Sequence, residues 1–323
     1  MSRIKKIAFE EHFMAPGFEK YSKAFLQFID PATAADLGRR LADIDTLRLE
    51  EMNKAGIALT ILSQTGPGVQ GEADTATAIQ GATENNNYLA SRIAKHPTRF
   101  AGFAALPMQD PQQAATELER AVVELGFKGA LVNGHSQGRY YDDPAYDVVW
   151  ERLQALDVPL YLHPTDFPQV PQTLAGFPVI QGAAWGWGVE TGSHALRLLF
   201  SGVFDRFPKL KLIIGHMGEG LPFQRWRFDS RFSAYPFGVK LQRKPSEYIG
   251  SNILITTSGV CSEAALKGAI AEMGAEAVLF SVDYPYESTA IAADFIEQSD
   301  LDETTRALVC HGNAERIFKL TPN

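Results

Sequence analysis

Five polar side chains lie at the ends of short apolar runs, at four widely separated places in the sequence. They are Glu10, His12, His163, His216 and Asp283. Carboxylate oxygens and imidazole nitrogens are ligands that zinc and manganese ions accept in proteins, often with one coordination position left open. If the fold brings these residues to one place, they would form a site for a divalent metal ion.

The segment Glu10-Glu11-His12 supplies two of these candidate ligands, and it follows the apolar run Ile7-Ala8-Phe9. Residues i and i+2 of a strand point to the same side. Glu10 and His12 would therefore face one way and Glu11 the other. On this motif alone, three solvated residues at a surface strand end are an equally good interpretation.

His163 and Asp283 end two further apolar runs. His163 follows residues 159–162 and precedes Pro164, which stops the strand. A lone histidine there is more often structural, but its place beside the first-strand pair favours a ligand. Asp283 follows the apolar run 277–282. A carboxylate in that position is unfavourable unless it is paired or metal-bound, although Asp-Tyr-Pro also fits a turn.

The segment His216-Met217-Gly218-Glu219 ends another strand pattern and opens a helix. His216 is either a further ligand or a partner that orients Asp283, and the sequence alone leaves both open. Glu219 would fix the tautomer of this imidazole, or would simply be a favourable acid in the first helical turn. A carbamate that bridges two metals would need a lysine at the carboxyl end of a strand. Lys128 instead precedes its strand, which favours one ion.

Strand and helix patterns alternate along the chain, and they predict how these residues are positioned. Strand patterns lie near residues 6–12, 57–63, 100–106, 129–133, 159–163, 211–216, 252–257 and 277–283. Eight alternations predict a single (β/α)8 (TIM) barrel domain over residues 1–323, whose strands share one carboxyl-end rim where active sites are built. We expect the long segments 13–42 and 164–192 to shape a substrate pocket or an oligomer contact. Residues 311–320 are predicted to form a helix on the barrel exterior.

Composition limits the possible functions. Of the 323 residues, 45% are hydrophobic and 21% charged, as in an ordinary globular enzyme. The net charge of -8 argues against a nucleic-acid partner. The charged start leads directly into a strand, unlike a signal peptide, and no run approaches the roughly 20 apolar residues of a membrane span. Cys261 and Cys310 have no metal or redox spacing, which favours buried thiols in the cytoplasm.

These motifs resemble the metal-dependent aromatic-acid decarboxylases of the amidohydrolase superfamily. The similarity is strongest to the γ-resorcylate (2,6-dihydroxybenzoate) decarboxylases, with the 2,3-dihydroxybenzoate and 5-carboxyvanillate decarboxylases as relatives. The matching stretches follow one another through nearly the whole chain, at residues 7–13, 103–107, 129–134, 160–164, 215–222, 255–259 and 279–285.

The resemblance implies a role for each candidate residue. It implies four ligands to one divalent ion, with Glu10 where the hydrolytic relatives carry the first histidine of His-x-His: Glu10, His12, His163 and Asp283. His216 and Glu219 would form a pair beside the ion, and Arg227 would be the cation that faces the substrate. Mixed nitrogen and oxygen ligands suit both Mn and Zn, and the resemblance favours Mn. No organic cofactor is implied, and relatives suggest a homodimer or homotetramer.

The activity expected from this resemblance is that of a carboxy-lyase of aromatic catabolism, acting on an ortho-hydroxybenzoate. The carboxylate and ortho oxygen of 2,6-dihydroxybenzoate would chelate the ion, and Asp283 would protonate the ring carbon before CO2 leaves. Phe13 and Trp185 or Trp187 would form apolar walls, or belong to ordinary core. The alternatives are a decarboxylase of another hydroxybenzoate, a metal-dependent hydrolase of a lactone or amide, and a non-catalytic metal-binding protein.

Overall fold

The computed structural model describes residues 3–26 and 29–320. Within them, eight parallel strands form a three-stranded sheet in the order β1-β2-β3 and a five-stranded sheet in the order β4-β5-β6-β7-β8. Their bounds are β1 Lys6–Phe13, β2 Ile57–Gln64, β3 Phe100–Gly102, β4 Ala130–Asn133, β5 Leu160–His163, β6 Leu212–Ile214, β7 Ile253–Thr256 and β8 Val278–Leu279.

Two bridges join the sheets into a closed ring. After β3, Ala104 pairs in parallel with Ala130 of β4. After β8, Tyr284 pairs with Glu11 of β1, and the His12 amide donates to the Tyr284 carbonyl at 2.7 Å. The predicted (β/α)8 barrel is thereby confirmed, and its first and last strands are joined at the β8–β1 seam.

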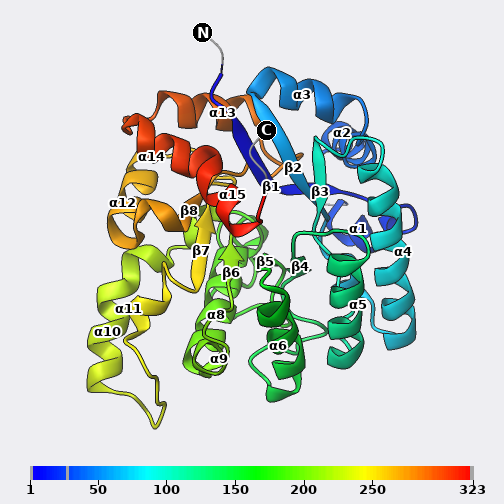
Figure 1. Ribbon diagram of the computed structural model, residues 1–323. Helices are drawn as coiled ribbons and strands as arrows, with labels where there is room; N and C mark the ends of the chain where they lie inside the picture. The colour runs from blue at the N-terminus through cyan, green and yellow to red at the C-terminus, as the bar shows by residue number, and fades with distance from the viewer. Residues whose placement is uncertain (1–2, 27–28, 321–323) are drawn as a thin grey trace.

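Helices surround the strands, which lie at the centre of the molecule (Figure 1). Aspartate or serine often begins a helix, because its side chain accepts hydrogen bonds from amides of the first turn. Asp110 caps Gln112 and Gln113 in this way, and Pro111 follows at the first helical position. The helices are α1 Glu19–Leu26, α2 Pro31–Ala42, α3 Leu47–Ala55, α4 Thr75–Ile93, α5 Pro111–Val123, α6 Asp147–Leu156, α7 Pro178–Gln181, α8 Gly186–Phe200, α9 Val203–Arg206, α10 Arg225–Ala234, α11 Pro245–Tyr248, α12 Glu263–Met273, α13 Thr289–Gln298, α14 Glu303–Ala307 and α15 Asn313–Ile317.

Alternate strand side chains build two apolar layers. One layer lies between the strands and the helices and includes Ala8, Leu62 and Leu162. The other fills the barrel interior and includes Phe9, whose ring packs edge-on against Phe103 at 6.3 Å. Period-two alternation produces this division, since neighbouring residues of a strand face opposite sides.

The carboxyl-terminal segment contributes to the interior layer. Phe318 follows α15 and is 3% exposed, with its ring 4.9 Å from that of Phe9 and 5.6 Å from that of Phe103. The prediction that residues 311–320 pack across the barrel exterior is therefore wrong for Phe318. Phe318 thereby adds its aromatic ring to the apolar layer that fills the barrel interior.

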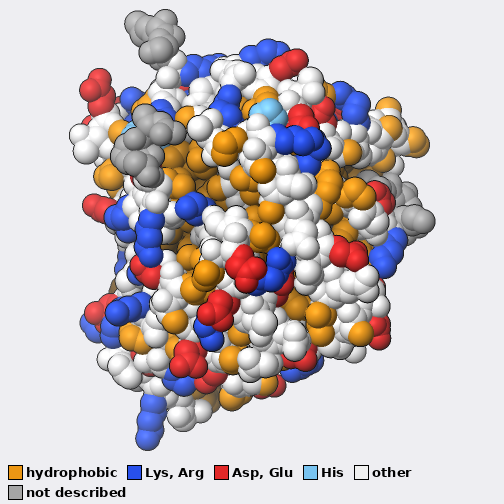
Figure 2. Space-filling view, turned by 45° about the vertical axis from the view of Figure 1, so that its right-hand side comes forward, with side chains coloured by type: hydrophobic (Ala, Val, Ile, Leu, Met, Phe, Trp, Pro, Cys, Tyr) orange, Lys and Arg blue, Asp and Glu red, His pale blue; other side chains and the backbone are white. Residues whose placement is uncertain are grey.

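The predicted long loops contain short helices and expose apolar side chains. Residues 13–42 include α1 and α2, and residues 164–192 include α7 and the start of α8. Phe177 and Val179 in the second segment are 63% and 76% exposed. On the face shown in Figure 2, Lys and Arg side chains are interspersed with Asp and Glu.

None of the helices in the described ranges has the length and apolar character needed to cross a bilayer.

Candidate metal centre

Three strands, the first, the fifth and the last, bring four of the predicted residues together. Glu10 and His12 come from β1, His163 ends β5, and Asp283 follows β8. One ligand atom from each of these residues lies within 4.8 Å of the others. Glu10 and His12 are fully buried, and His163 is 7% exposed. This nitrogen and oxygen donor set suits a divalent ion.

A β-bulge in β1 aims Glu10 into the centre. The pairing of β1 with β2 shifts between Ala8 and Glu11, and the amides of Phe9 and Glu10 both donate to Ser281 Oγ, at 3.0 and 3.1 Å. The extra residue lets Phe9 and Glu10 both face the barrel interior, where strict alternation would send them to opposite sides. The hydroxyl of Ser281, which follows β8 near the other end of the chain, thus sets the direction of this ligand.

Hydrogen bonds orient both imidazoles. His163 Nδ1 lies 3.0 Å from the Pro164 carbonyl, an acceptor, so Nδ1 carries the proton and Nε2 keeps its lone pair. His12 Nδ1 lies 3.1 Å from Ser63 Oγ, which fits the same tautomer. Burial lowers the pKa of His163 well below its usual value. His163 is therefore the neutral imidazole that a metal ion requires.

Three atoms of the centre are buried and have no hydrogen-bond partner: Glu10 Oε1, His12 Nε2 and Asp283 Oδ1. A buried polar atom left unpaired destabilises a protein by about 1–3 kcal/mol. Here the unpaired atoms face one another, with His12 Nε2 3.3 Å from Asp283 Oδ1. A divalent cation would satisfy all three and offset the two carboxylate charges, so the residues fit such an ion.

His216 and Glu219 form a pair beside the four residues. His216 Nδ1 lies 2.7 Å from Glu219 Oε1, and Nε2 lies 3.6 Å from Asp283 Oδ2 and 3.8 Å from Glu10 Oε1. His216, Glu219 and Asp283 have φ angles of 50°, 51° and 80°, a strained conformation for non-glycine residues that is concentrated at functional sites. This geometry favours the orienting role over a fifth ligand.

Charges at the centre set opposite protonation states for His216 and Asp283. Burial lowers the pKa of His216, but the charges of Glu10 and Glu219 outweigh burial and raise it well above its usual value. Burial raises the pKa of Asp283, but the nearby imidazoles of His12 and His216 outweigh burial and lower it below its usual range. The resting pair is thus an imidazolium beside a carboxylate.

The structure does not bring the other predicted site residues to this cluster. Phe13 alternates with His12 and so faces outward, where its fully buried ring stacks on Tyr88 at 6.1 Å. Arg227 is exposed on α10, beside Trp226, which is 79% exposed. Trp187 is also separate from the four ligands, and its Nε1 donates to Asp166 Oδ1 at 2.6 Å.

The sequence reasoning missed Tyr161, whose hydroxyl donates to Glu10 Oε2. The signal was available, because Tyr161 lies two residues before His163 on the same strand and must share its inward side. Ser63 and Ser281 were also missed. A serine carries no comparable signal until the strands that it joins are known.

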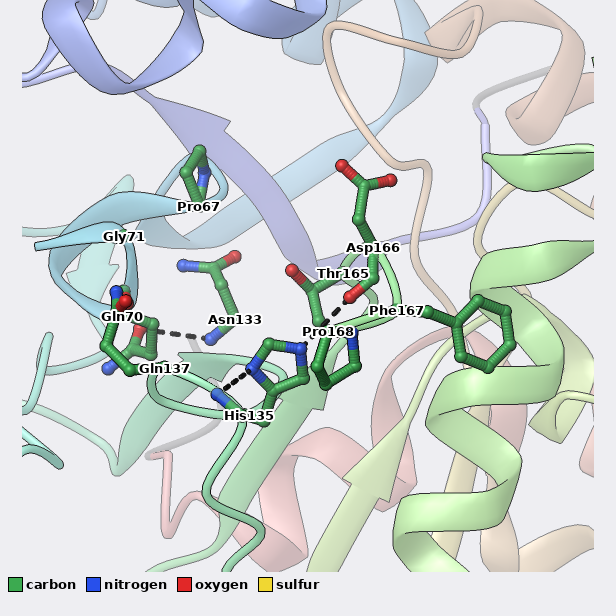
Figure 3. A pocket seen from close by; sticks show the side chains of 11 residues that line it. Pro67, Gln70, Gly71, Asn133, His135, Gln137, Thr165, Asp166, Phe167 and Pro168 are labelled. Carbon is green, nitrogen blue, oxygen red and sulfur yellow. Dashed lines mark hydrogen bonds between the residues drawn. The ribbon is translucent and has the colours of Figure 1, made fainter. Parts of the chain in front are cut away.

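A cavity of about 400 Å3 lies on the β2, β4 and β5 side of the centre (Figure 3), within the size range of small-molecule pockets. Asn133 in its wall is the register partner of His163 on the neighbouring strand. Its backbone amide donates to Gln70 Oε1 at 3.1 Å, while its side-chain Oδ1 is buried without a hydrogen-bond partner. His135 Nε2 donates to the Asp166 carbonyl at 3.1 Å and joins two of the loops. The metal ligands do not line this cavity, so it lies beside the centre.

Comparison with known proteins finds relatives that are similar over nearly the whole chain. Residues 38–320 match the family model described as amidohydrolase. A γ-resorcylate decarboxylase from a Polaromonas species is 45% identical over 98% of each chain. A crystal structure of 2,6-dihydroxybenzoate decarboxylase complexed with 2,6-dihydroxybenzoate is 42% identical, with a TM-score of 0.93 over 98% of this chain and 99% of that one. A Polaromonas dihydroxybenzoic acid decarboxylase with bound manganese and the inhibitor 2-nitroresorcinol is 44% identical, with a TM-score of 0.93 over 99% and 98%.

Proposed function

The chain belongs to the amidohydrolase family, and from that premise we propose that it is a carboxy-lyase converting 2,6-dihydroxybenzoate to resorcinol and CO2 without an oxidant. The observation that carries this proposal is the likeness of nearly the whole chain to 2,6-dihydroxybenzoate decarboxylases, at 42–45% identity. The centre agrees with it, because a carboxylate, Glu10, takes the first position of the metal-binding pair on β1.

One divalent ion, manganese in preference to zinc, is the cofactor in this proposal. Glu10, His12, His163 and Asp283 would hold it, and the structure of a relative with bound manganese supports the choice. When bound, the ion supplies positive charge that holds the substrate carboxylate and its ortho oxygen and fixes the ring. No organic cofactor is part of the proposal.

Asp283 is the proposed acid. Its carboxyl proton is transferred to the ring carbon that bears the carboxylate, and the carbon–carbon bond to that carboxylate then breaks to release CO2 and restore aromaticity. Because the resting Asp283 is ionised, it must first gain a proton inside the site. His216 is placed to give it, since its Nε2 lies 3.6 Å from Asp283 Oδ2, and Glu219 stabilises the imidazolium. Each turnover consumes one proton.

The unpaired Asn133 Oδ1 supports a substrate with a second hydroxyl group. It is a buried acceptor next to His163, and the hydrogen of a ring hydroxyl would satisfy it. Salicylate, which has one hydroxyl, would leave this atom unpaired.

A homodimer or homotetramer in the cytoplasm completes the proposal. Exposed apolar side chains on α10 and the 164–192 loop support an oligomer contact, with Trp226, Phe177 and Val179 exposed by 79%, 63% and 76%. Arg227 lies in the same α10 surface, so its predicted contact with substrate is proposed to occur where subunits meet.

The test is to load the purified protein with Mn2+ and incubate it with 2,6-dihydroxybenzoate, measuring CO2 and resorcinol. Equal amounts of both products are expected. Turnover of only 2,3-dihydroxybenzoate or 5-carboxyvanillate would keep the reaction and replace the substrate. Hydrolysis of a lactone or amide with no CO2 release would contradict the proposal.

A further inference from the structure

The Glu10 carboxylate is held differently at its two oxygens. Oε2 accepts from the Tyr161 hydroxyl of β5, and Thr256 Oγ1 of β7 donates to it at 3.3 Å. Oε1 has no hydrogen-bond partner and faces the centre. Glu10, Tyr161 and Thr256 are fully buried, so no solvent exchanges with these bonds.

The hydroxyl groups themselves are held in place. Thr256 Oγ1 lies 2.8 Å from Ser258 Oγ, and Ser258 Oγ accepts from the backbone amide of His216 at 3.1 Å. Tyr161 packs edge-on against Phe9 at 6.1 Å in the barrel interior. Rigid neighbours therefore support both donors, and the geometry at Oε2 does not depend on a mobile loop.

The backbone of Gly215, directly after β6, lies against the remaining side of the carboxylate. A Cβ on Gly215 would lie 2.6 Å from Glu10 Oε2 and 2.8 Å from Oε1. Only glycine lets this backbone approach the carboxylate so closely. We name Tyr161, Thr256, Ser258 and Gly215 the Glu10 cradle.

We propose that Tyr161 and Thr256 are positioning residues that anchor Oε2 and so present Oε1 of Glu10 alone to the metal ion. A carboxylate free to rotate can bind a cation through either oxygen or both, whereas an anchored one offers a single defined ligand atom. Groups that hold a metal ligand typically change metal affinity 10- to 100-fold when they are removed. This inference rests on the metal centre of the proposed function and does not depend on the substrate.

The test is the dissociation constant of Mn2+, measured on the full-length protein without substrate from the electron paramagnetic resonance signal of free Mn2+. Tyr161→Phe removes one hydroxyl and is expected to weaken Mn2+ binding 10- to 100-fold. Thr256→Val is expected to weaken it in the same direction, and Thr256→Ser, which keeps the hydroxyl, should restore it. Tyr146→Phe is the matched control, because this fully buried tyrosine donates to the Met108 carbonyl at 3.0 Å.

A double-mutant cycle separates positioning from general loosening of the core. If Tyr161 acts through the carboxylate, Tyr161→Phe should change Mn2+ affinity less than threefold in a Glu10→Ala background. An equal loss in both backgrounds, or a Tyr161→Phe protein with wild-type affinity, would overturn the inference. Failure of the proposed substrate would leave these titrations unaffected. A wild-type protein that binds no Mn2+ would overturn the inference and the metal centre together.

Discussion

Replacing Gly215 by alanine adds one methyl group at the most crowded position of the centre. The added Cβ would lie 2.6 and 2.8 Å from the two oxygens of Glu10 and 3.0 Å from Ser258 Oγ. Gly215 has a φ of -78°, which alanine adopts without strain. Any effect therefore comes from contact with these side chains and not from the backbone.

The expected magnitude follows from these distances. A Cβ atom essentially never lies within 3.0 Å of a non-bonded atom, so Glu10 must move by several tenths of an ångström. Both oxygens are crowded, so a small rotation cannot relieve the contact. Overpacking of this kind destabilises a protein by about 1–3 kcal/mol. Displacing a metal ligand should also weaken Mn2+ binding by about 10- to 100-fold, equivalent to about 1.4–2.8 kcal/mol.

The assay compares Gly215→Ala with Gly38→Ala. Gly38 lies in α2, and a Cβ there meets nothing within 4 Å. Alanine in the interior of that helix should raise the free energy of unfolding by about 0.5–1 kcal/mol and leave the metal untouched. We would measure urea unfolding, Mn2+ titration and kcat for both variants. Wild-type Mn2+ affinity and kcat in Gly215→Ala would refute the reasoning about the close approach.

Three further predictions follow from the centre and its surroundings. Asp283→Asn should lower kcat by about 10²- to 10⁴-fold while the protein still binds Mn2+, and normal turnover of this variant would exclude Asp283 as the acid. Burial raises the pKa of Glu190, on α8, to about 7, so the folded protein holds a proton there that the unfolded chain releases near its ordinary value of 4.5. The free energy of unfolding should therefore fall by up to about 3 kcal/mol as the pH rises from 4.5 to 7. Urea unfolding at pH 5 and pH 8 should show this loss in the wild type and not in Glu190→Gln. The same pH dependence in the two proteins would contradict the prediction. Removing the metal with EDTA should lower the free energy of unfolding by about 2.7 kcal/mol relative to protein in Mn2+ at 100 times its dissociation constant, and identical melting curves would argue against a bound ion.

The positions of the strands and the approach of the four candidate ligands were predictable because they depend on local patterns. Each strand is a short apolar run, and its last residues must lie at the common rim of a parallel barrel. Spacing within one segment also suggested the pairing of His216 with Glu219, which lies three residues further along.

Features that depend on contacts between distant segments were not predictable from the pattern. The bulge that turns Glu10 inward requires Ser281, about 270 residues away, as a shared acceptor. Phe318 packs in the barrel interior against residues of several strands, and these contacts exist only once the strands are assembled. Strand alternation after the bulge sends Phe13 outward, away from the pocket that the sequence suggested for it.

The most direct test of the central claim combines metal content with product analysis on the same sample of purified protein. Mass spectrometry would give the metal content of each chain, and a spectrophotometric assay would follow 2,6-dihydroxybenzoate while CO2 is collected. We predict about one Mn or Zn ion per chain, as the one cluster of four ligands within the described residues requires, and release of CO2 with resorcinol. Protein that carries no metal, cannot be loaded with Mn2+ and yet decarboxylates this substrate would contradict the account.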